Sequence, residues 1–183
     1  MVGVGNLERG DDAAGRIALA RLRGRVAADL ELIEESGEAT ALLAAMEGAT
    51  AAYLIDTCIS GAAPGTIHRF DVAAARGPRT LRACSTHGLG LAESLELARA
   101  LGTLPSPCVL YAIEGTSFEL GAPLSDAVRG QIDALCARIA AEIEASTPET
   151  SARVQPQPKR DREARKSSGG NGRITPAGNQ RTA

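Results

Sequence analysis

Apolar and polar positions along this chain alternate with a period of two in some stretches and are continuously apolar in others. The alternation at Leu30–Glu34 and at Thr66–Asp71 predicts strands with one face in water, the second of them at a sheet edge. Ala51–Ile55 and Cys108–Glu114 are apolar almost throughout, which is typical of central parallel strands covered on both faces. The first apolar residues of the chain predict one more short, buried strand, which looks clipped, as if the natural start lay upstream.

Between these strands, apolar residues recur at the 3.6-residue period of helices. The predicted helices run from Asp11 or Asp12 to about Leu22, from Ala39 to Met46, from about Leu89 to Leu101, and from Ser125 through Ile143. Either Asp11 or Asp12 fits the N-cap of the first helix, since a carboxylate accepts hydrogen bonds from free N–H groups there. No element is predicted for residues 72–82. Strands that alternate with helices imply a three-layer α/β fold, with a mostly parallel, twisted sheet flanked by helices.

The composition changes near residue 147. Residues 1–147 have the size of one ordinary domain, whereas residues 148–183 are rich in Pro, Gly, Ser, Gln, Lys and Arg and are predicted to form a disordered tail. Residues 1–148 carry a net charge of −7, from 12 Lys and Arg against 19 Asp and Glu, and residues 149–183 carry +5, from 8 against 3. The acidic domain argues against nucleic-acid binding. The basic tail is either passive or a docking arm for an acidic partner.

The chain shows no targeting segment and no paired cysteines. No run approaches the roughly 18 apolar residues of a membrane span, and no basic-then-apolar leader is present, so a soluble cytoplasmic protein without membrane contact is expected. The cysteines, Cys58, Cys84, Cys108 and Cys136, form no C-x-x-C pair, so neither a structural zinc site nor a redox dithiol is indicated. Cys108 and Cys136 lie in apolar runs and are predicted to be small buried hydrophobic residues.

A glycine loop joins the first strand to the first helix. Gly3, Gly5 and Gly10 permit a tight turn there, but the third glycine comes too late for the dinucleotide fingerprint G-x-G-x-x-G. Asp11 and Asp12 also place two negative charges where a phosphate would bind, so a nucleotide site is disfavoured. A pair of carboxylates at this place suits a cation better.

Candidate ligands lie next to three of the predicted elements. Asp11 and Asp12 follow the first strand, Asp56 follows the central strand, and His87 precedes a helix, so all are expected at the carboxyl edge of the sheet. Two carboxylate oxygens and one imidazole nitrogen suit Ni, Zn, Fe or Mn with positions left open. Each residue also has a simpler interpretation: Asp12 as a helix cap, Asp56 as a turn former and His87 as a loop hydrogen-bonder.

Nucleophilic catalysis by a serine or cysteine is less favoured. Cys84 and Ser85 lie beside His87, but the nucleophile elbow G-x-S-x-G is absent, and adjacent residues rarely point at each other. The second histidine, His68, alternates outward on the predicted edge strand and is expected to be a solvated surface residue.

Three motifs together resemble the hydrogenase maturation proteases, the endopeptidases that trim the C-terminus of a [NiFe]-hydrogenase large subunit. They are Gly3-Val4-Gly5-Asn6-Leu7-x-x-Gly10-Asp11-Asp12-x-x-Gly15, the strand-end Asp56, and Ser85-Thr86-His87-Gly88-Leu89-Gly90-Leu91. The similarity spans about residues 2–145. It implies a twisted α/β sheet between helices, in agreement with the hydrophobic pattern, and it favours a monomer.

The resemblance implies that Asp12, Asp56 and His87 are the catalytic and metal-contacting residues. The matching family residues, often Glu at the first position, are understood to sense nickel that the substrate precursor carries, so cleavage follows nickel insertion. The chain is therefore expected to be a nickel-dependent endopeptidase for a [NiFe]-hydrogenase large-subunit precursor, with an aspartic-type or a metal-assisted mechanism. The alternative is a nickel-sensing checkpoint protein without proteolytic activity. Glu35–Thr40 departs from the Asp-Gly-Gly-Thr-like loop of many members, which leaves open which hydrogenase is served.

Overall fold

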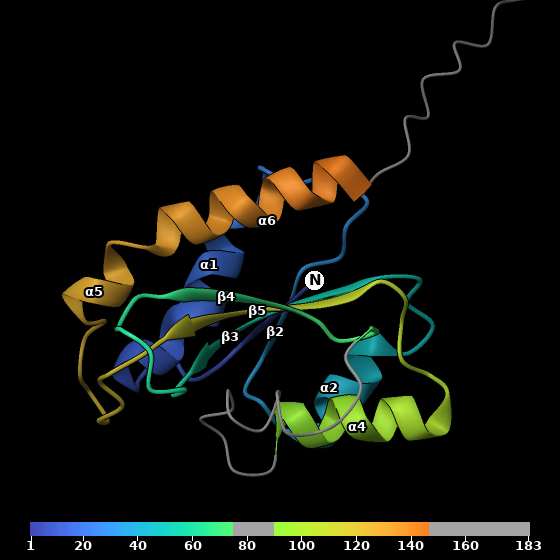
Figure 1. Ribbon diagram of the computed structural model, residues 1–183, viewed down its shortest axis with the longest axis horizontal. Coiled ribbons are helices and arrows are strands. Elements are labelled where there is room, and N and C mark those ends of the chain that lie inside the picture. The colour runs from blue at the N-terminus through green and yellow to red at the C-terminus, as the bar shows by residue number, and fades with distance from the viewer. Residues whose placement is uncertain (75–89, 147–183) are drawn as a thin grey trace, which may run out of the picture. The chain divides into compact units, whose positions relative to one another are not determined.

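A five-stranded sheet forms the centre of the protein, with helices on both faces (Figure 1). The structure is a computed structural model and describes residues 1–74 and 90–146. The strands lie in the order β2-β1-β3-β5-β4. Their bounds are Val2–Val4 (β1), Ile33–Glu35 (β2), Ala52–Cys58 (β3), Ile67–Asp71 (β4) and Cys108–Glu114 (β5). All neighbouring strands are parallel except β4, which pairs antiparallel with β5.

The two continuously apolar runs form the centre of the sheet, as predicted. Every residue of β3 and of β5 is buried, and the strands pair in register over seven residues, from Ala52 with Cys108 to Cys58 with Glu114. A strand buried on both faces gains from apolar side chains at every position, which explains the missing alternation. The alternating stretch at β4 lies at the sheet edge, again as predicted.

The second strand differs from its predicted position. The alternation begins at Leu30, but β2 runs only from Ile33 to Glu35 because its partner β1 has three residues to pair with. Leu30 and Leu32, which precede β2, instead pack against the apolar core on one side of the sheet. Ile33 packs against the core on the other side, so the apolar residues of this stretch do not share one face, and the ladder length decided where the strand starts.

Helices α1 (Ala14–Leu22) and α6 (Ile132–Ser146) cover one face of the sheet, and α2 (Ala39–Met46) and α4 (Leu91–Leu101) cover the other (Figure 1). Successive side chains of β3 point to opposite faces of the sheet. Ile55 belongs to the core under α1 and α6, whereas Leu54 belongs to the core under α2 and α4. This arrangement confirms the three-layer α/β fold with helices on both sides.

The first and the last of the predicted helices are less regular than expected. The first helix opens with a 3-10 turn, η1 (Gly10–Ala13), and neither Asp11 nor Asp12 caps η1 or α1, so the N-cap prediction was wrong. The last predicted helix is two helices, α5 (Asp126–Arg129) and α6, separated by Gly130 and Gln131. Glycine is a poor helix former, which fits a break at this point. Ser125 caps α5 by accepting a hydrogen bond from Val128 N.

Several sequence-based predictions lie outside the described residues: most of the 72–82 stretch, Cys84, Ser85, His87 and the tail at 148–183. The boundary at residue 147 and the disorder of the tail therefore remain predictions. Within residues 1–74 and 90–146, no helix has the length and apolar character needed to cross a membrane.

Candidate functional site

Asp11 serves the structure of the loop before α5. Its side chain is fully buried and accepts three backbone hydrogen bonds, from Thr116 N at 2.9 Å, Ser117 N at 3.0 Å and Ser125 N at 2.7 Å. These bonds hold the loop onto η1. Backbone donors thus occupy both oxygens of this carboxylate. Of the two adjacent carboxylates, Asp11 is therefore the structural one.

Asp12 lies in the same turn, buried to 1% exposure, and its Oδ2 accepts a hydrogen bond from Asn6 N at 3.2 Å. The glycine loop brings the chain close enough for this contact. Gly5 has a φ of +130°, and a Cβ there would lie 1.8 Å from the Asp12 carbonyl oxygen, so no other residue fits without moving the turn. The prediction that the glycines serve a tight strand-to-helix turn is confirmed.

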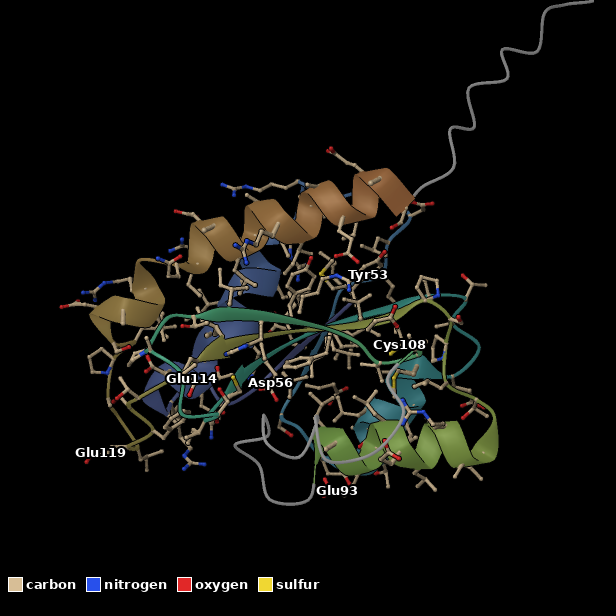
Figure 2. All side chains as sticks on the ribbon, viewed as in Figure 1. Tyr53, Asp56, Glu93, Cys108, Glu114 and Glu119 are labelled. Atoms are coloured by element: carbon tan, nitrogen blue, oxygen red, sulfur yellow. The ribbon has the colours of Figure 1, made fainter. Side chains whose placement is uncertain are left out.

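Asp56 lies inside β3, two residues before its end, and is also buried to 1% exposure. Its Oδ1 accepts a hydrogen bond from Thr57 N at 2.7 Å. Since side chains alternate along a strand, Asp56 shares the α2–α4 face with Leu54 and Cys58. Figure 2 shows Asp56 and Glu114 toward one end of the central strands, and Cys108 toward the other.

Two contacts bring η1 and α1 against the carboxyl half of β3. Thr57 Oγ1 donates a hydrogen bond to the Asp11 carbonyl oxygen at 2.6 Å. At Gly15 the backbone of α1 comes so close that a Cβ would lie 2.3 Å from both Val4 O and Ile55 O. Asp12 and Asp56 therefore lie at one edge of the sheet, where the sequence analysis expected them. The third expected ligand, His87, lies outside the described residues.

His68 is not the solvated surface residue that the alternation of β4 predicted. Its side chain is only 24% exposed, and its Nε2 lies 3.4 Å from Glu114 Oε2. The adjacent Cys58 also contacts this carboxylate. Burial alone would raise the pKa of Glu114, but hydrogen bonds from Ser60, Cys58 and Gly61 outweigh it and hold that pKa below its ordinary value. No local sequence pattern indicated this group, because its members are far apart along the chain.

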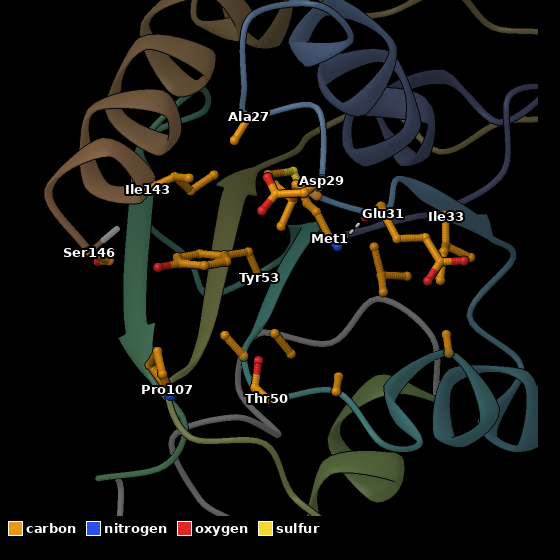
Figure 3. Close-up of a pocket in the computed structure, with 16 residues that line it drawn as sticks. Met1, Ala27, Asp29, Glu31, Ile33, Thr50, Tyr53, Pro107, Ile143 and Ser146 are labelled. Carbon is orange, nitrogen blue, oxygen red and sulfur yellow. Dashed lines mark hydrogen bonds between the residues drawn. The ribbon is translucent and has the colours of Figure 1, made fainter. Parts of the chain in front are cut away.

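A cavity of about 370 Å³ opens at the opposite edge of the sheet (Figure 3). Its lining includes Val2, Ala52 and Pro107, which lie at or beside the amino ends of three parallel strands, together with Asp29 and Tyr53. Neither Asp12 nor Asp56 lines this cavity. Its volume alone does not make it the reactive site, because open α/β sheets bind their ligands at the carboxyl ends of the strands.

The comparison with protein families decides what kind of protein carries this site. A family model for hydrogenase maturation proteases matches residues 20–142. The chain belongs to this family. The match includes Asp56 and begins after Asp12. The family acts on hydrogenase large-subunit precursors, which supports a hydrolase of the maturation protease type. No curated protein sequence matches the chain.

Solved structures agree with the family and with the fold. The chain is similar to the hydrogenase-maturating endopeptidase HybD from E. coli, at 25% identity and a TM-score of 0.63, over 79% of this chain and 91% of that one. The [NiFe] hydrogenase maturation protease HycI from Thermococcus kodakarensis gives 26% identity and a TM-score of 0.58, over 78% and 90%. An Escherichia coli endopeptidase at 24% identity, with a TM-score of 0.67 over 80% and 92%, shares the fold.

Proposed function

We propose that this maturation protease removes the C-terminal extension of a [NiFe]-hydrogenase large-subunit precursor after nickel has been inserted. The nickel belongs to the substrate, and Asp12, Asp56 and His87 contact it during recognition. The chain then acts as a checkpoint, because a precursor without nickel lacks the group that these side chains bind.

The observation that carries this proposal is the burial of Asp12 and Asp56 at one edge of the sheet. Both carboxylates are about 1% exposed, and they come from two elements that the glycine turn and the Thr57–Asp11 hydrogen bond hold together. Carboxylate oxygens combined with an imidazole nitrogen form a donor set that suits nickel among the divalent ions. In this proposal Asp12 and Asp56 supply two oxygen ligands, and His87 supplies the nitrogen.

The chemical step needs a nucleophile, and two of the three described cysteines are poor candidates for that role. Cys108 and Cys136 are buried, and burial raises the pKa of both thiols, that of Cys108 to about 12. Water is then the better nucleophile against the scissile carbonyl. Either one of the two carboxylates accepts its proton as a general base, or the substrate's nickel lowers the pKa of a bound water.

The test is a processing assay with the unprocessed large subunit of the same cell, with and without nickel, followed by mass spectrometry. We expect a discrete C-terminal peptide to be lost only from the nickel-loaded precursor. Asp12→Asn, Asp56→Asn and His87→Ala should each abolish this loss. Asp29→Asn is the matched control, since Asp29 is exposed and lies at the opposite edge of the sheet. Normal processing by Asp12→Asn or His87→Ala would contradict the assignment of these residues.

The same assay separates the protease from a checkpoint protein without proteolytic activity. A checkpoint protein would bind the nickel-loaded precursor and leave its mass unchanged. Pull-down of the precursor by wild-type protein, with no change in mass over a long incubation, would therefore overturn the proteolytic proposal and retain nickel sensing. Equal cleavage of nickel-free precursor would overturn the nickel dependence and retain the protease.

A further inference from the structure

Three neighbouring strands bring a thiol, an imidazole and a carboxylate together on one face of the sheet. Cys58 and Glu114 are the last residues of β3 and β5 and lie directly opposite each other. His68 on β4 pairs with Ala112, two residues before Glu114, so its side chain points to the same face. The small side chain of Ala112 leaves room for the imidazole to reach the carboxylate.

Two of the distances among these side chains are close to those of ligands around one small metal ion. Cys58 Sγ lies 3.2 Å and His68 Nε2 lies 3.4 Å from Glu114 Oε2, and one potential ligand atom from each of the three residues lies within 4.8 Å of the others. A tetrahedral ion with bonds of about 2.0–2.3 Å to nitrogen, oxygen and sulfur sets its ligand atoms about 3.4–3.6 Å apart. Small side-chain rotations therefore suffice to place an ion between the three atoms.

The imidazole nitrogen nearest to Glu114 has no hydrogen bond within the part of the chain that the structure describes. His68 Nε2 is shielded from solvent and makes no hydrogen bond to any atom of residues 1–74 and 90–146. A buried polar atom without a hydrogen bond costs free energy, and coordination of a cation by this nitrogen removes that cost. Phe70 fixes the ring plane, since the two rings stack with their centroids 6.0 Å apart and their planes at 18°.

The carboxylate is oriented for coordination through a single oxygen. Glu114 Oε1 accepts hydrogen bonds from Ser60 N and Gly61 N, both at 2.8 Å. These backbone donors leave Oε2 to Cys58, to His68 and to the Ser60 hydroxyl, which donates a hydrogen bond to it at 2.7 Å. Outer hydrogen bonds of this kind commonly orient the ligands of metal sites.

We propose that Cys58, His68 and Glu114 bind one divalent cation of the Zn²⁺ class, at a site separate from the Asp12, Asp56 and His87 set. A thiolate and an imidazole favour zinc over the hard ions Mg²⁺ and Ca²⁺. Cys58 coordinates as the thiolate, and its proton passes to solvent when the ion binds. Three protein ligands leave a fourth position for water. None of its three residues is among those assigned to nickel, so this proposal does not rest on the proposed proteolytic function. Cys58 nevertheless lies two residues from Asp56 on the same face of β3.

Cobalt is the probe, because Co²⁺ replaces zinc and its bond to a thiolate gives a charge-transfer absorption in the near ultraviolet. The full chain, reduced and freed of metal with a chelator, is titrated with Co²⁺ and then with Zn²⁺. We expect the absorption to appear with one cobalt per chain and to vanish as zinc displaces it. Cys58→Ser should abolish it, and His68→Gln should weaken cobalt binding by more than about tenfold.

Matched variants separate this site from the other candidate ligands. Cys84→Ser and Cys108→Ala test the other thiols, and Asp12→Asn tests the nickel-contacting set; each should keep the absorption at wild-type cobalt affinity. Circular dichroism checks the fold of every variant. His68→Gln keeps the test decisive if Cys58→Ser does not fold, because His68 lies on the edge strand β4. The proposal is overturned by absence of the absorption in wild type, its persistence in Cys58→Ser, unchanged affinity in His68→Gln, or its loss in Cys84→Ser or Asp12→Asn.

Discussion

Gly15 lies where helix α1 comes closest to the sheet, and it is the position where the smallest substitution should have a large effect. An added Cβ would lie 2.3 Å from the carbonyl oxygens of both Val4 and Ile55. Both are backbone atoms of β1 and β3, so no side-chain rotation relieves the contact. We predict that Gly15→Ala lowers the free energy of unfolding and moves η1, with Asp12, away from β3.

The magnitude follows from two opposing effects. The new methyl group stands about 1 Å short of ordinary van der Waals contact, and overpacking of this kind costs about 1–3 kcal/mol. Alanine is also the better helix former, by about 1 kcal/mol. Because both obstacles are backbone atoms, we take the cost at its upper end and expect a net loss of about 2 kcal/mol. For a domain of this size, that loss lowers Tm by roughly 4–8 °C.

Urea denaturation of both proteins measures the stability change, and the precursor assay at a temperature where both are folded measures the displacement of Asp12. Gly130→Ala is the matched control, because Gly130 has a φ of −67° and the nearest atom to its added Cβ is 3.2 Å away. We expect Gly130→Ala to change stability by less than about 1 kcal/mol and to process precursor normally. Gly15→Ala with wild-type or higher stability would refute the close-approach argument.

Four further predictions concern ionisable groups. Asp11→Asn replaces one acceptor oxygen with an NH₂ group, which faces backbone N–H donors and cannot accept their hydrogen bonds. Urea unfolding should show that the free energy of unfolding falls by about 1–3 kcal/mol, and unchanged stability would contradict the structural role of Asp11. The Arg69 guanidinium holds the pKa of Glu142 below its ordinary value, so this pair stabilises the fold above the unfolded-state pKa of Glu142 and the stability is lost as pH falls through the lower folded-state pKa. Glu142→Gln should flatten that acid limb in thermal melts across pH. Burial and a hydrogen bond to Glu142 raise the pKa of Tyr111 to about 12, so its contribution is complete below about pH 10 and is lost as pH rises toward 12. Phenolate absorbance measured across pH would follow the ionisation of Tyr111, with Tyr111→Phe as the control. Burial raises the pKa of Cys108 to about 12, so native protein should protect this thiol from alkylation at neutral pH and urea should expose it, as mass spectrometry can check; prompt labelling of the native thiol would contradict its burial.

The elements that the sequence predicted well are those whose patterns are local. The continuous apolar runs of β3 and β5 predicted central parallel strands, and the helix predicted over Ala39–Met46 is α2, with the same bounds. Burial by the sheet or by a helix face acts on each residue through its own side chain, so the pattern survives in the sequence. The boundaries were less secure, as β2 and the α5–α6 break show, because pairing partners and loops set them.

The candidate site was predictable only in part. That Asp12 and Asp56 lie at one edge followed from the rule that parallel strands end on the same side of a sheet. The sequence did not indicate that Asp11, of the two adjacent carboxylates, is the one that holds the loop before α5. The three donors to Asp11 come from Thr116, Ser117 and Ser125, more than a hundred residues away along the chain.

The sequence by itself thus determined the layers of this protein, its central strands and the edge at which its acidic residues gather. Only the tertiary structure decided the partners of individual polar groups. The grouping of Cys58, His68 and Glu114 depends on the antiparallel register of β4 against β5, and a shift of one residue would turn His68 to the other face. Such a register is fixed by contacts between distant segments, and a pattern of neighbouring residues carries no record of it.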